Sequence, residues 1–225
     1  MGNQFSNLIK KHKNAVKCFL AVNYHCQQAL LELLHSNGVP SDPEELFQFF
    51  NTNEKKAKIN KLQKKKILKS DQVNLLLPQN QRTFSQKWDI TLITLVIIHF
   101  SSLLPPSGGS WKIKDPDTND VTAGACVLNI RNTRNSMNHA AMETLKDENT
   151  LNGTFTAVDM YLVNLNYSRI AEFRGMNIEA FDPALFMDTI HCPKEKKDVI
   201  VKCLQWYKTE NEKSKFFSLF LTCEI

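Results

Sequence analysis

Apolar residues recur at helical spacing along most of this chain, and glycine, proline and asparagine separate the resulting segments. The pattern predicts a first helix over residues 4–35 that stops at Asn37-Gly38. A second begins at Asp42-Pro43, where a capping carboxylate precedes a proline at the first helical position. Further helices are expected over residues 55–69, 71–77, 89–104, 119–145 and 147–165, with shorter helical pieces between 168 and 191.

The composition agrees with a helical protein. Only 7 glycines and 8 prolines occur among 225 residues, and with 42% hydrophobic and 23% charged residues the chain is an ordinary globular one. We therefore expect an all-α fold and exclude a disordered or collagen-like chain. We expect one domain over residues 1–192. The composition shifts after Pro193, so residues 193–225 are expected to form a helical extension of unknown role.

The apolar run at residues 90–104 predicts a buried helix, because about 20 apolar residues are needed to cross a bilayer. The segment Met1-Gly2-Asn3-Gln4-Phe5-Ser6 fits the N-myristoylation pattern with Gly2 as acceptor, and it equally fits the start of the first helix. No apolar signal core stands near the start. We therefore expect a cytoplasmic protein that touches a membrane peripherally, and only if Gly2 is acylated.

Six cysteines are scattered through the chain without a Cys-x-x-Cys pair and without a cluster of histidines. Zinc sites require closely spaced ligand pairs, so we expect no metal site and no cofactor. In a reducing compartment the thiols are expected to be free.

One predicted helix carries chemistry as well as core residues. Arginine occurs only five times in the chain, and Arg131 and Arg134 lie one helical turn apart. At about 100° per residue, Val127, Ile130 and Met137 share one side of this helix. The adjoining arc holds a polar strip made of Arg131, Arg134, Asn135, Asn138 and His139.

This strip has the groups needed to cleave RNA without a metal. His139 can take the proton of a ribose 2′-hydroxyl or donate one to the leaving oxygen, Arg134 can hold the phosphate, and Asn135 can orient either partner. One imidazole cannot be acid and base at once, so a two-fold dimer is the simplest complete site. The alternative is that Arg134 and His139 are half-buried polar residues at a helix interface with no catalytic role.

The second basic feature is a run of lysines on the helix expected at 55–69. Such a run can follow a phosphate backbone, although charge runs are also common on solvated helix faces. The net charge is only +5. We assign RNA contact to the whole run: Lys55, Lys56, Lys58, Lys61, Lys64, Lys65, Lys66 and Lys69.

Several sequence blocks resemble one protein family. The signature at residues 134–139, an arginine, a polar residue, three further residues and a histidine, is that of the HEPN superfamily, and Ile130-Arg131 precedes it. Two blocks upstream narrow the resemblance to the branch typified by the HEPN domain of the DAZ-interacting zinc-finger ubiquitin ligase. They are Trp88-Asp89-Ile90-Thr91-Leu92 and Leu103-Leu104-Pro105-Pro106-Ser107-Gly108-Gly109-Ser110-Trp111.

The resemblance implies an all-α bundle with four principal helices and short accessory helices, which forms a homodimer through the signature helices. It implies Arg134, Asn135 and His139 as site residues, with Arg131 and Asn138 in support. The expected function is RNA binding, without DNA binding, together with a metal-independent endoribonuclease site that leaves 2′,3′-cyclic phosphate ends. The alternative is a non-catalytic dimerisation or protein-interaction module of a protein related to ubiquitin ligases or to innate-immune proteins.

Overall fold

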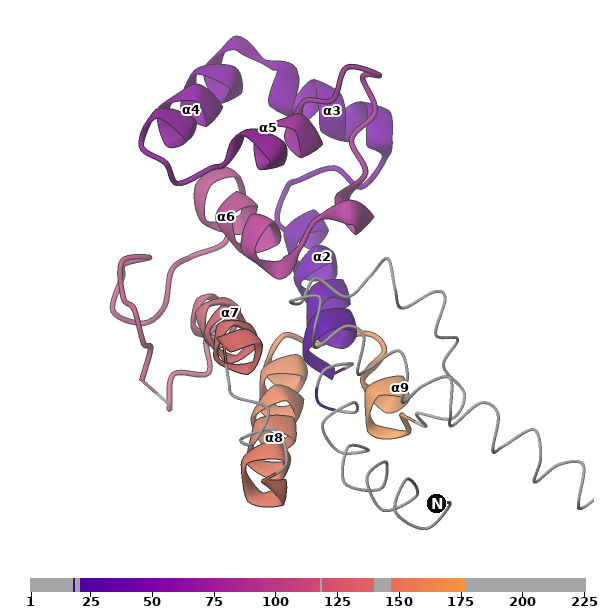
Figure 1. The fold of residues 1–225 in the computed structure, drawn as a ribbon, viewed down its shortest axis with the longest axis vertical. Coiled ribbons are helices and arrows are strands. Elements are labelled where there is room, and N and C mark those ends of the chain that lie inside the picture. Colours follow the sequence, from indigo (N-terminus) through magenta and orange to yellow (C-terminus); the bar gives the residue numbers. More distant parts are fainter. Residues whose placement is uncertain (1–17, 19–20, 118, 140–146, 177–225) are drawn as a thin grey trace, which may run out of the picture. The chain divides into compact units, whose positions relative to one another are not determined.

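The computed structural model describes residues 18, 21–117, 119–139 and 147–176, and the side chains of residues 138, 139 and 148 lie outside this description. Regular structure within these residues is helical, and they include no β-strand. Figure 1 shows the helices along the chain. The all-α expectation is confirmed.

The bounds of the described helices are η1 (Ala21–His25, π-helical), α2 (Cys26–Ser36), α3 (Pro43–Asn51), α4 (Asn53–Lys64), α5 (Ser70–Leu76), η2 (Ser85–Lys87, 3-10), α6 (Ile90–Phe100), α7 (Ala123–His139), α8 (Glu148–Asn164) and α9 (Ile170–Arg174). The two longest described helices, α7 and α8, both lie after residue 101.

The chain divides into two compact units. The described residues of the first lie within Cys26–Asn132 and Tyr161–Ser168, and those of the second are residues 18, 21–25, 133–139, 147–160 and 169–176. The predicted boundary at residue 192 and the expected extension at 193–225 fall outside the described residues and stay predictions.

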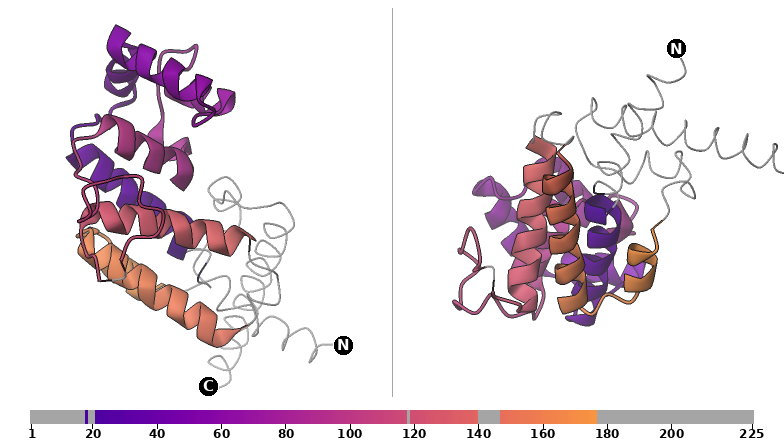
Figure 2. Two further views of the ribbon diagram at one scale, coloured as in Figure 1. Left: turned by 90° about the vertical axis from the view of Figure 1, so that its left-hand side faces the viewer. Right: turned by 90° about the horizontal axis from the view of Figure 1, so that it is seen from below.

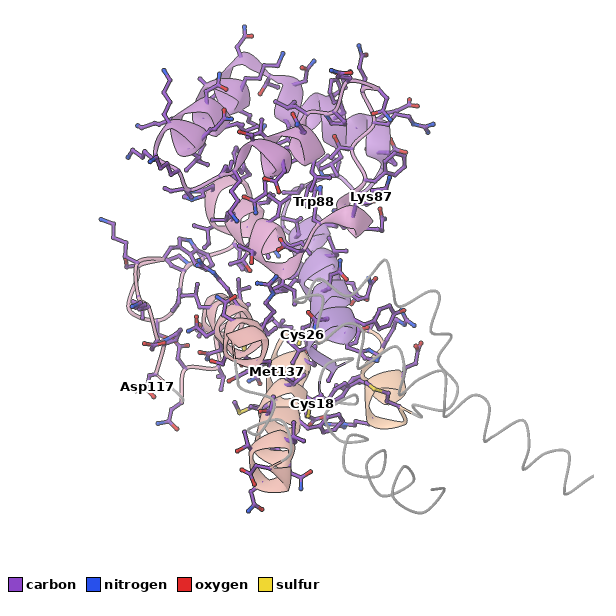
Figure 3. All side chains as sticks on the ribbon, in the orientation of Figure 1. Cys18, Cys26, Lys87, Trp88, Asp117 and Met137 are labelled. Atoms are coloured by element: carbon purple, nitrogen blue, oxygen red, sulfur yellow. The ribbon has the colours of Figure 1, made fainter. Side chains whose placement is uncertain are left out.

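Helix α6 is the centre of the first unit. It is apolar on every side, with Leu92, Ile93 and Val96 buried, and it packs against α2. Trp88, immediately before α6, is also fully buried, whereas its neighbour Lys87 is exposed (Figure 3). A helix without a polar face is stable only when other elements remove it from water.

Polar and aromatic contacts join α2 and α3 to Trp88 and to the end of α6. The Nε2 atom of Gln27 on α2 donates to the carbonyl oxygen of Trp88 at 2.7 Å. The ring of Phe50 on α3 meets those of Trp88 and Phe100 edge-on, with centroids 6.0 and 5.4 Å apart. Edge-to-face pairs at these distances are favourable beyond the area they bury.

The predicted helix starts agree closely with the structure. The Oδ1 atom of Asp42 accepts from the backbone N–H groups of Glu44 and Glu45 at 2.9 and 3.1 Å, and Pro43 opens α3. Thr52 ends α3 and caps α4. These side chains satisfy N–H groups that have no partner within their own helix.

Two predicted helix ends were wrong. The lysine-rich helix stops at Lys64 instead of residue 69, and α6 stops at Phe100 instead of Leu104. In the first case Lys66 turns the chain with a left-handed backbone, φ 57°. In the second, Ser101 adopts an extended backbone four residues before the prolines.

The N-terminal helix and the start of α7 also differ from expectation. The stop at Asn37-Gly38 is confirmed, since Gly38 has φ 88°, but the described part opens with the π-helical η1, and residues 4–17 lie outside the description. The helix expected from residue 119 begins at Ala123, and Thr122 caps it, because its Oγ1 accepts from the N–H of Ala125 at 3.3 Å.

The first turn of α7 lies against the chain that follows α6. A β-carbon on Gly124 would stand 2.6 Å from the carbonyl oxygen of Leu104 and 2.7 Å from backbone atoms of Pro105 and Pro106. Backbone cannot move aside as a flexible side chain can. Glycine at position 124 therefore sets how closely the 104–106 segment approaches α7.

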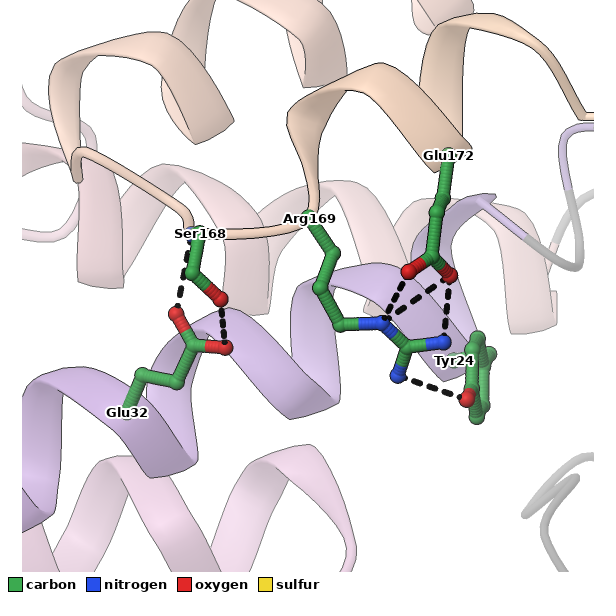
Figure 4. A network of polar contacts seen from close by, with 5 residues as sticks. All are labelled: Tyr24, Glu32, Ser168, Arg169 and Glu172. Atoms are coloured by element: carbon green, nitrogen blue, oxygen red, sulfur yellow. Dashed lines mark hydrogen bonds and ion pairs between the residues drawn. The ribbon is translucent and has the colours of Figure 1, made fainter.

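The second unit contains a network centred on Arg169, drawn in Figure 4. Its guanidinium pairs with the carboxylate of Glu172, with Nε 2.9 Å from Oε1, and Nη1 donates to the hydroxyl of Tyr24 at 2.9 Å.

His25 in the same unit is 2% exposed and meets the Phe173 ring edge-on. Burial and then the Arg169 charge lower the pKa of His25 to about 4, opposed by Glu172. His25 is therefore a neutral core residue.

Replacing Gly124 by Ala is expected to lower the free energy of unfolding by about 1–3 kcal/mol, because the new methyl group overlaps fixed backbone. The matched control is Gly153→Ala, which adds the same methyl within α8, where nothing lies within 4 Å. That change is expected to stabilise by about 0.5–1 kcal/mol through helix propensity. Urea unfolding measures both values. Equal stability of Gly124→Ala and wild type would contradict the proposed close approach.

Candidate functional site

Helix α7 has the two faces that its sequence predicts. Val127 and Ile130 are fully buried and Met137 nearly so, which confirms the apolar stripe. Figure 2 shows α7 as one unbroken helix. Residues on the adjoining arc therefore keep the spacing of a regular helix, about 100° per residue.

The structure brings two of the predicted site residues into direct contact. The Nη1 atom of Arg134 donates to Oδ1 of Asn135 at 3.1 Å, and both side chains are half-buried. This hydrogen bond restricts the guanidinium and fixes which end of the carboxamide faces it. Arg134 and Asn135 thus form a positioned cation and amide pair on the polar arc.

Arg131 precedes this pair by one turn of α7. It is half-buried, and its Nε atom has no hydrogen-bond partner among the described residues. A buried N–H of a charged group is costly to leave unpaired. The support role assigned to Arg131 stays a prediction.

Other predicted residues can be placed only in part. His139 is the last residue of α7, five positions after Arg134, and Asn138 precedes it. Both side chains lie outside the described residues, as does Gly2. Their assignments stay predictions.

Asn132 is a structural residue of α7 that the sequence did not reveal. Its Nδ2 atom donates to the carbonyl oxygen of Lys114 at 2.8 Å and to Oδ1 of Asp115 at 3.2 Å. Both acceptors belong to the loop at residues 107–117, between α6 and α7. The loop is thereby tied to the helix that carries Arg134, through a contact spanning 18 residues.

The start of the same loop is held by Asp120. Its Oδ2 accepts from the N–H of Ser107 at 2.8 Å, and its Oδ1 accepts from the hydroxyl and N–H of Thr122 at 2.6 and 3.0 Å. The hydrogen bonds from Thr122, and then those from Ser107, lower the pKa of Asp120 to about 2. The carboxylate form is therefore the one that holds the loop.

The lysine run is divided by its contacts. Lys55 Nζ lies 3.8 Å from the centroid of Phe49, and Lys58 Nζ lies 5.2 Å from that of Phe100 and donates to the carbonyl oxygen of His99. These two lysines cover aromatic rings and, for Lys58, the end of α6. Lys56 is half-buried. The remaining members are exposed, namely Lys61, Lys64, Lys65, Lys66 and Lys69.

The described thiols are unsuited to nucleophilic catalysis. Cys18, Cys26 and Cys126 are free and buried. Burial raises the pKa of the Cys26 thiol. Burial also raises the pKa of Cys126, to about 11, although a hydrogen bond with Asn164 acts in the opposite direction and lowers it. A thiol held protonated at neutral pH is a poor nucleophile and a poor metal ligand.

The part of the chain that the structure describes contains no group of three or more His, Cys, Asp or Glu side chains arranged to hold a metal ion. None of the helices in that part is both long enough and apolar enough to span a bilayer.

Helical architecture and the α7 signature together indicate a HEPN-type protein. Residues 43–187, well over half of the chain, match the family described as DZIP3/hRUL138-like HEPN. The chain therefore belongs to this family, as the sequence blocks suggested. Comparisons with curated proteins and with solved structures found no match.

The Asp120 contacts predict an acid-sensitive loop. Because the pKa of Asp120 is lower in the folded chain than the usual value near 3.9, its contribution to stability is complete above about pH 4 and is lost as the pH falls toward 2. Asp120→Asn is expected to lower the melting temperature at pH 7, and the difference from wild type is expected to shrink below pH 4. Calorimetry across this range measures it. A difference independent of pH would contradict the assignment.

Proposed function

We propose that this protein binds RNA and cleaves it without a metal ion, using Arg134, Asn135 and His139 on α7. The observation that carries the proposal is the 3.1 Å contact between Arg134 and Asn135 on a half-buried arc. Family membership supports the assignment, because residues 134–139 lie within the matched region. Arg131 and Asn138 are proposed as supporting residues.

Each group has a role that suits its chemistry. The 2′-hydroxyl attacks the neighbouring phosphorus while an imidazole removes its proton. The bond to the 5′-oxygen breaks, and that oxygen takes a proton from an imidazolium. The products are a 2′,3′-cyclic phosphate and a 5′-hydroxyl. Arg134 stabilises the added negative charge with its forked donors, and the Asn135 oxygen keeps the guanidinium oriented.

The two proton transfers require two imidazoles in opposite protonation states. The ordinary pKa of histidine, near 6.5, allows both states to be populated near neutral pH. We infer that a homodimer brings together His139 from each copy. DNA lacks the attacking 2′-hydroxyl and is not a substrate on this mechanism.

RNA binding is proposed to involve the lysine run over residues 55–69. We place the protein in the cytoplasm, with membrane contact only if Gly2 is acylated. The competing function is a dimerisation or protein-interaction module, in which the same helix has no catalytic role.

Cleavage tests the proposal directly. His139→Ala is expected to lower the cleavage rate of single-stranded RNA by about 10²–10⁴-fold, because general acid–base catalysis typically contributes that much. Ser136→Ala, an exposed position of α7, is the matched control and is expected to retain full activity. Gel analysis in EDTA with detection of 2′,3′-cyclic ends provides the measurement. Absence of cleavage by wild type under all conditions would favour the interaction module.

Mixing tests the shared site. If a productive dimer needs two intact His139 side chains, an equal mixture of wild type and His139→Ala at fixed total protein is expected to show about one quarter of wild-type activity after subunit exchange. Independent protomers would show about one half. Analytical ultracentrifugation of each protein confirms that dimers are present. An activity of one half would contradict the composite site.

A further inference from the structure

The lysines at the C-terminal end of the run are exposed and take no part in the described polar contacts of the fold. We call Lys61, Lys64, Lys65, Lys66 and Lys69 the lysine strip. None of these side chains makes an ion pair or a hydrogen bond with a described residue. Lys55 and Lys58, in contrast, are engaged by aromatic rings and a helix end. Lysines at the beginning of the run thus contact other parts of the fold, whereas the lysine strip at its end faces solvent.

The spacing within α4 puts like charges beside one another. Lys61 is followed by Lys64 and Lys65 at three and four residues, and Lys58 precedes it by three. Residues so spaced are neighbours on the helix surface, and like charges there destabilise the helix. Glu54, the only acidic residue of α4, lies in its first turn, away from the strip.

Lys66 occupies a backbone position that favours glycine. Its φ is 57°, its N–H donates to the carbonyl of Gln63 at 2.9 Å, and the N–H of Ile67 donates to that of Leu62 at 3.0 Å. This is the Schellman ending of a helix, in which the left-handed residue is usually glycine because a β-carbon is strained there. Lysine occupies this position in spite of that strain.

Helix dipoles explain only part of the strip. Lys61 and Lys64 lie in the last turn of α4, where positive charge is favourable. Lys69 is the N-cap of α5 and makes no side-chain capping hydrogen bond. The start of a helix disfavours a cation. Repulsion within α4, backbone strain at Lys66 and an unfavourable cap at Lys69 thus accompany this concentration of positive charge.

We propose that the lysine strip binds the sugar–phosphate backbone of the RNA substrate. The inference rests on the proposed function for the identity of the polyanion, and it narrows RNA contact from the whole run to its C-terminal end. Phosphate binding would relieve the repulsion between the lysines, and it releases counterions from the RNA. An anionic membrane fits less well. Ile67, 40% exposed, is the one large apolar side chain exposed on residues 53–76, whereas interfacial helices bury an apolar face.

The test uses the full chain and a fluorescein-labelled 2′-O-methyl oligoribonucleotide, which cannot be cleaved through its 2′-oxygen. The strip variant is Lys61→Gln, Lys64→Gln and Lys65→Gln combined. The control removes three exposed lysines elsewhere, with Lys87→Gln, Lys112→Gln and Lys114→Gln combined. Fluorescence anisotropy at several KCl concentrations gives the affinity and its salt dependence.

The strip variant is expected to bind at least about tenfold more weakly, and its log–log salt slope is expected to fall by about 2, since each lost phosphate contact removes about 0.7 for single-stranded RNA. The control is expected to change neither quantity. Equal effects of the two triple variants would overturn the proposal. So would unchanged RNA binding by the strip variant together with lost binding to phosphatidylserine vesicles.

Lys66→Gly separates binding from stability. It removes one charge and also the backbone strain, so it is expected to raise the melting temperature while weakening RNA binding. A higher melting temperature with unchanged RNA affinity would contradict a binding role for Lys66.

The binding proposal and the nuclease proposal can fail separately. If wild type binds the uncleavable RNA through the strip but never cleaves natural RNA, the nuclease proposal is refuted and the proposal of RNA binding by the strip is not.

Discussion

The burial of α6 is the constraint on which the first unit depends. An eleven-residue helix with no polar face has to be largely covered by other elements, and its residues 92–97 are all buried. Helix α2 packs against it, and Trp88 is buried immediately before its start. The ring of Phe50 meets both Trp88 and Phe100, and the ammonium of Lys58 donates to the carbonyl oxygen of His99 in the last turn. The need to enclose one apolar segment therefore explains why Gln27, Phe50 and Lys58 lie where they do.

Local chemistry made much of the fold predictable from sequence. Asp42, Thr52 and Asp89 begin helices because their side chains satisfy nearby N–H groups, and such signals span three or four residues. The two wrong ends have local and tertiary causes that residue type does not signal. The Ser101 hydroxyl donates to the carbonyl of Ile97, and the Ser102 hydroxyl donates to the carbonyl of Asn37. Lys66 adopts a left-handed backbone, although the residue there is not the glycine that usually marks such a turn. Contacts of this kind leave no periodic trace in a sequence.

The candidate site was predictable in its residue types and incompletely in its geometry. Helical spacing put Arg134 beside Asn135 on the polar arc, and the structure joins them. The roles of Asn132 and Gly124 depend on backbone atoms 18 to 20 residues earlier in the chain, so spacing within α7 could not reveal them. Spacing within the lysine run likewise could not reveal the contacts of Lys55 and Lys58, because their partners Phe49 and Phe100 come from other helices.

One tie within the first unit has a consequence for synthesis on the ribosome. The carboxylate of Glu32 accepts from the hydroxyl and N–H of Ser168, 136 residues further along. At about 5–20 residues per second, that partner is added roughly 7–27 seconds after Glu32. Helices α2 and α6 are both complete long before then. The apolar α6 can therefore pack against α2 early in synthesis, and the Tyr161–Ser168 segment is the last part of the unit to join it.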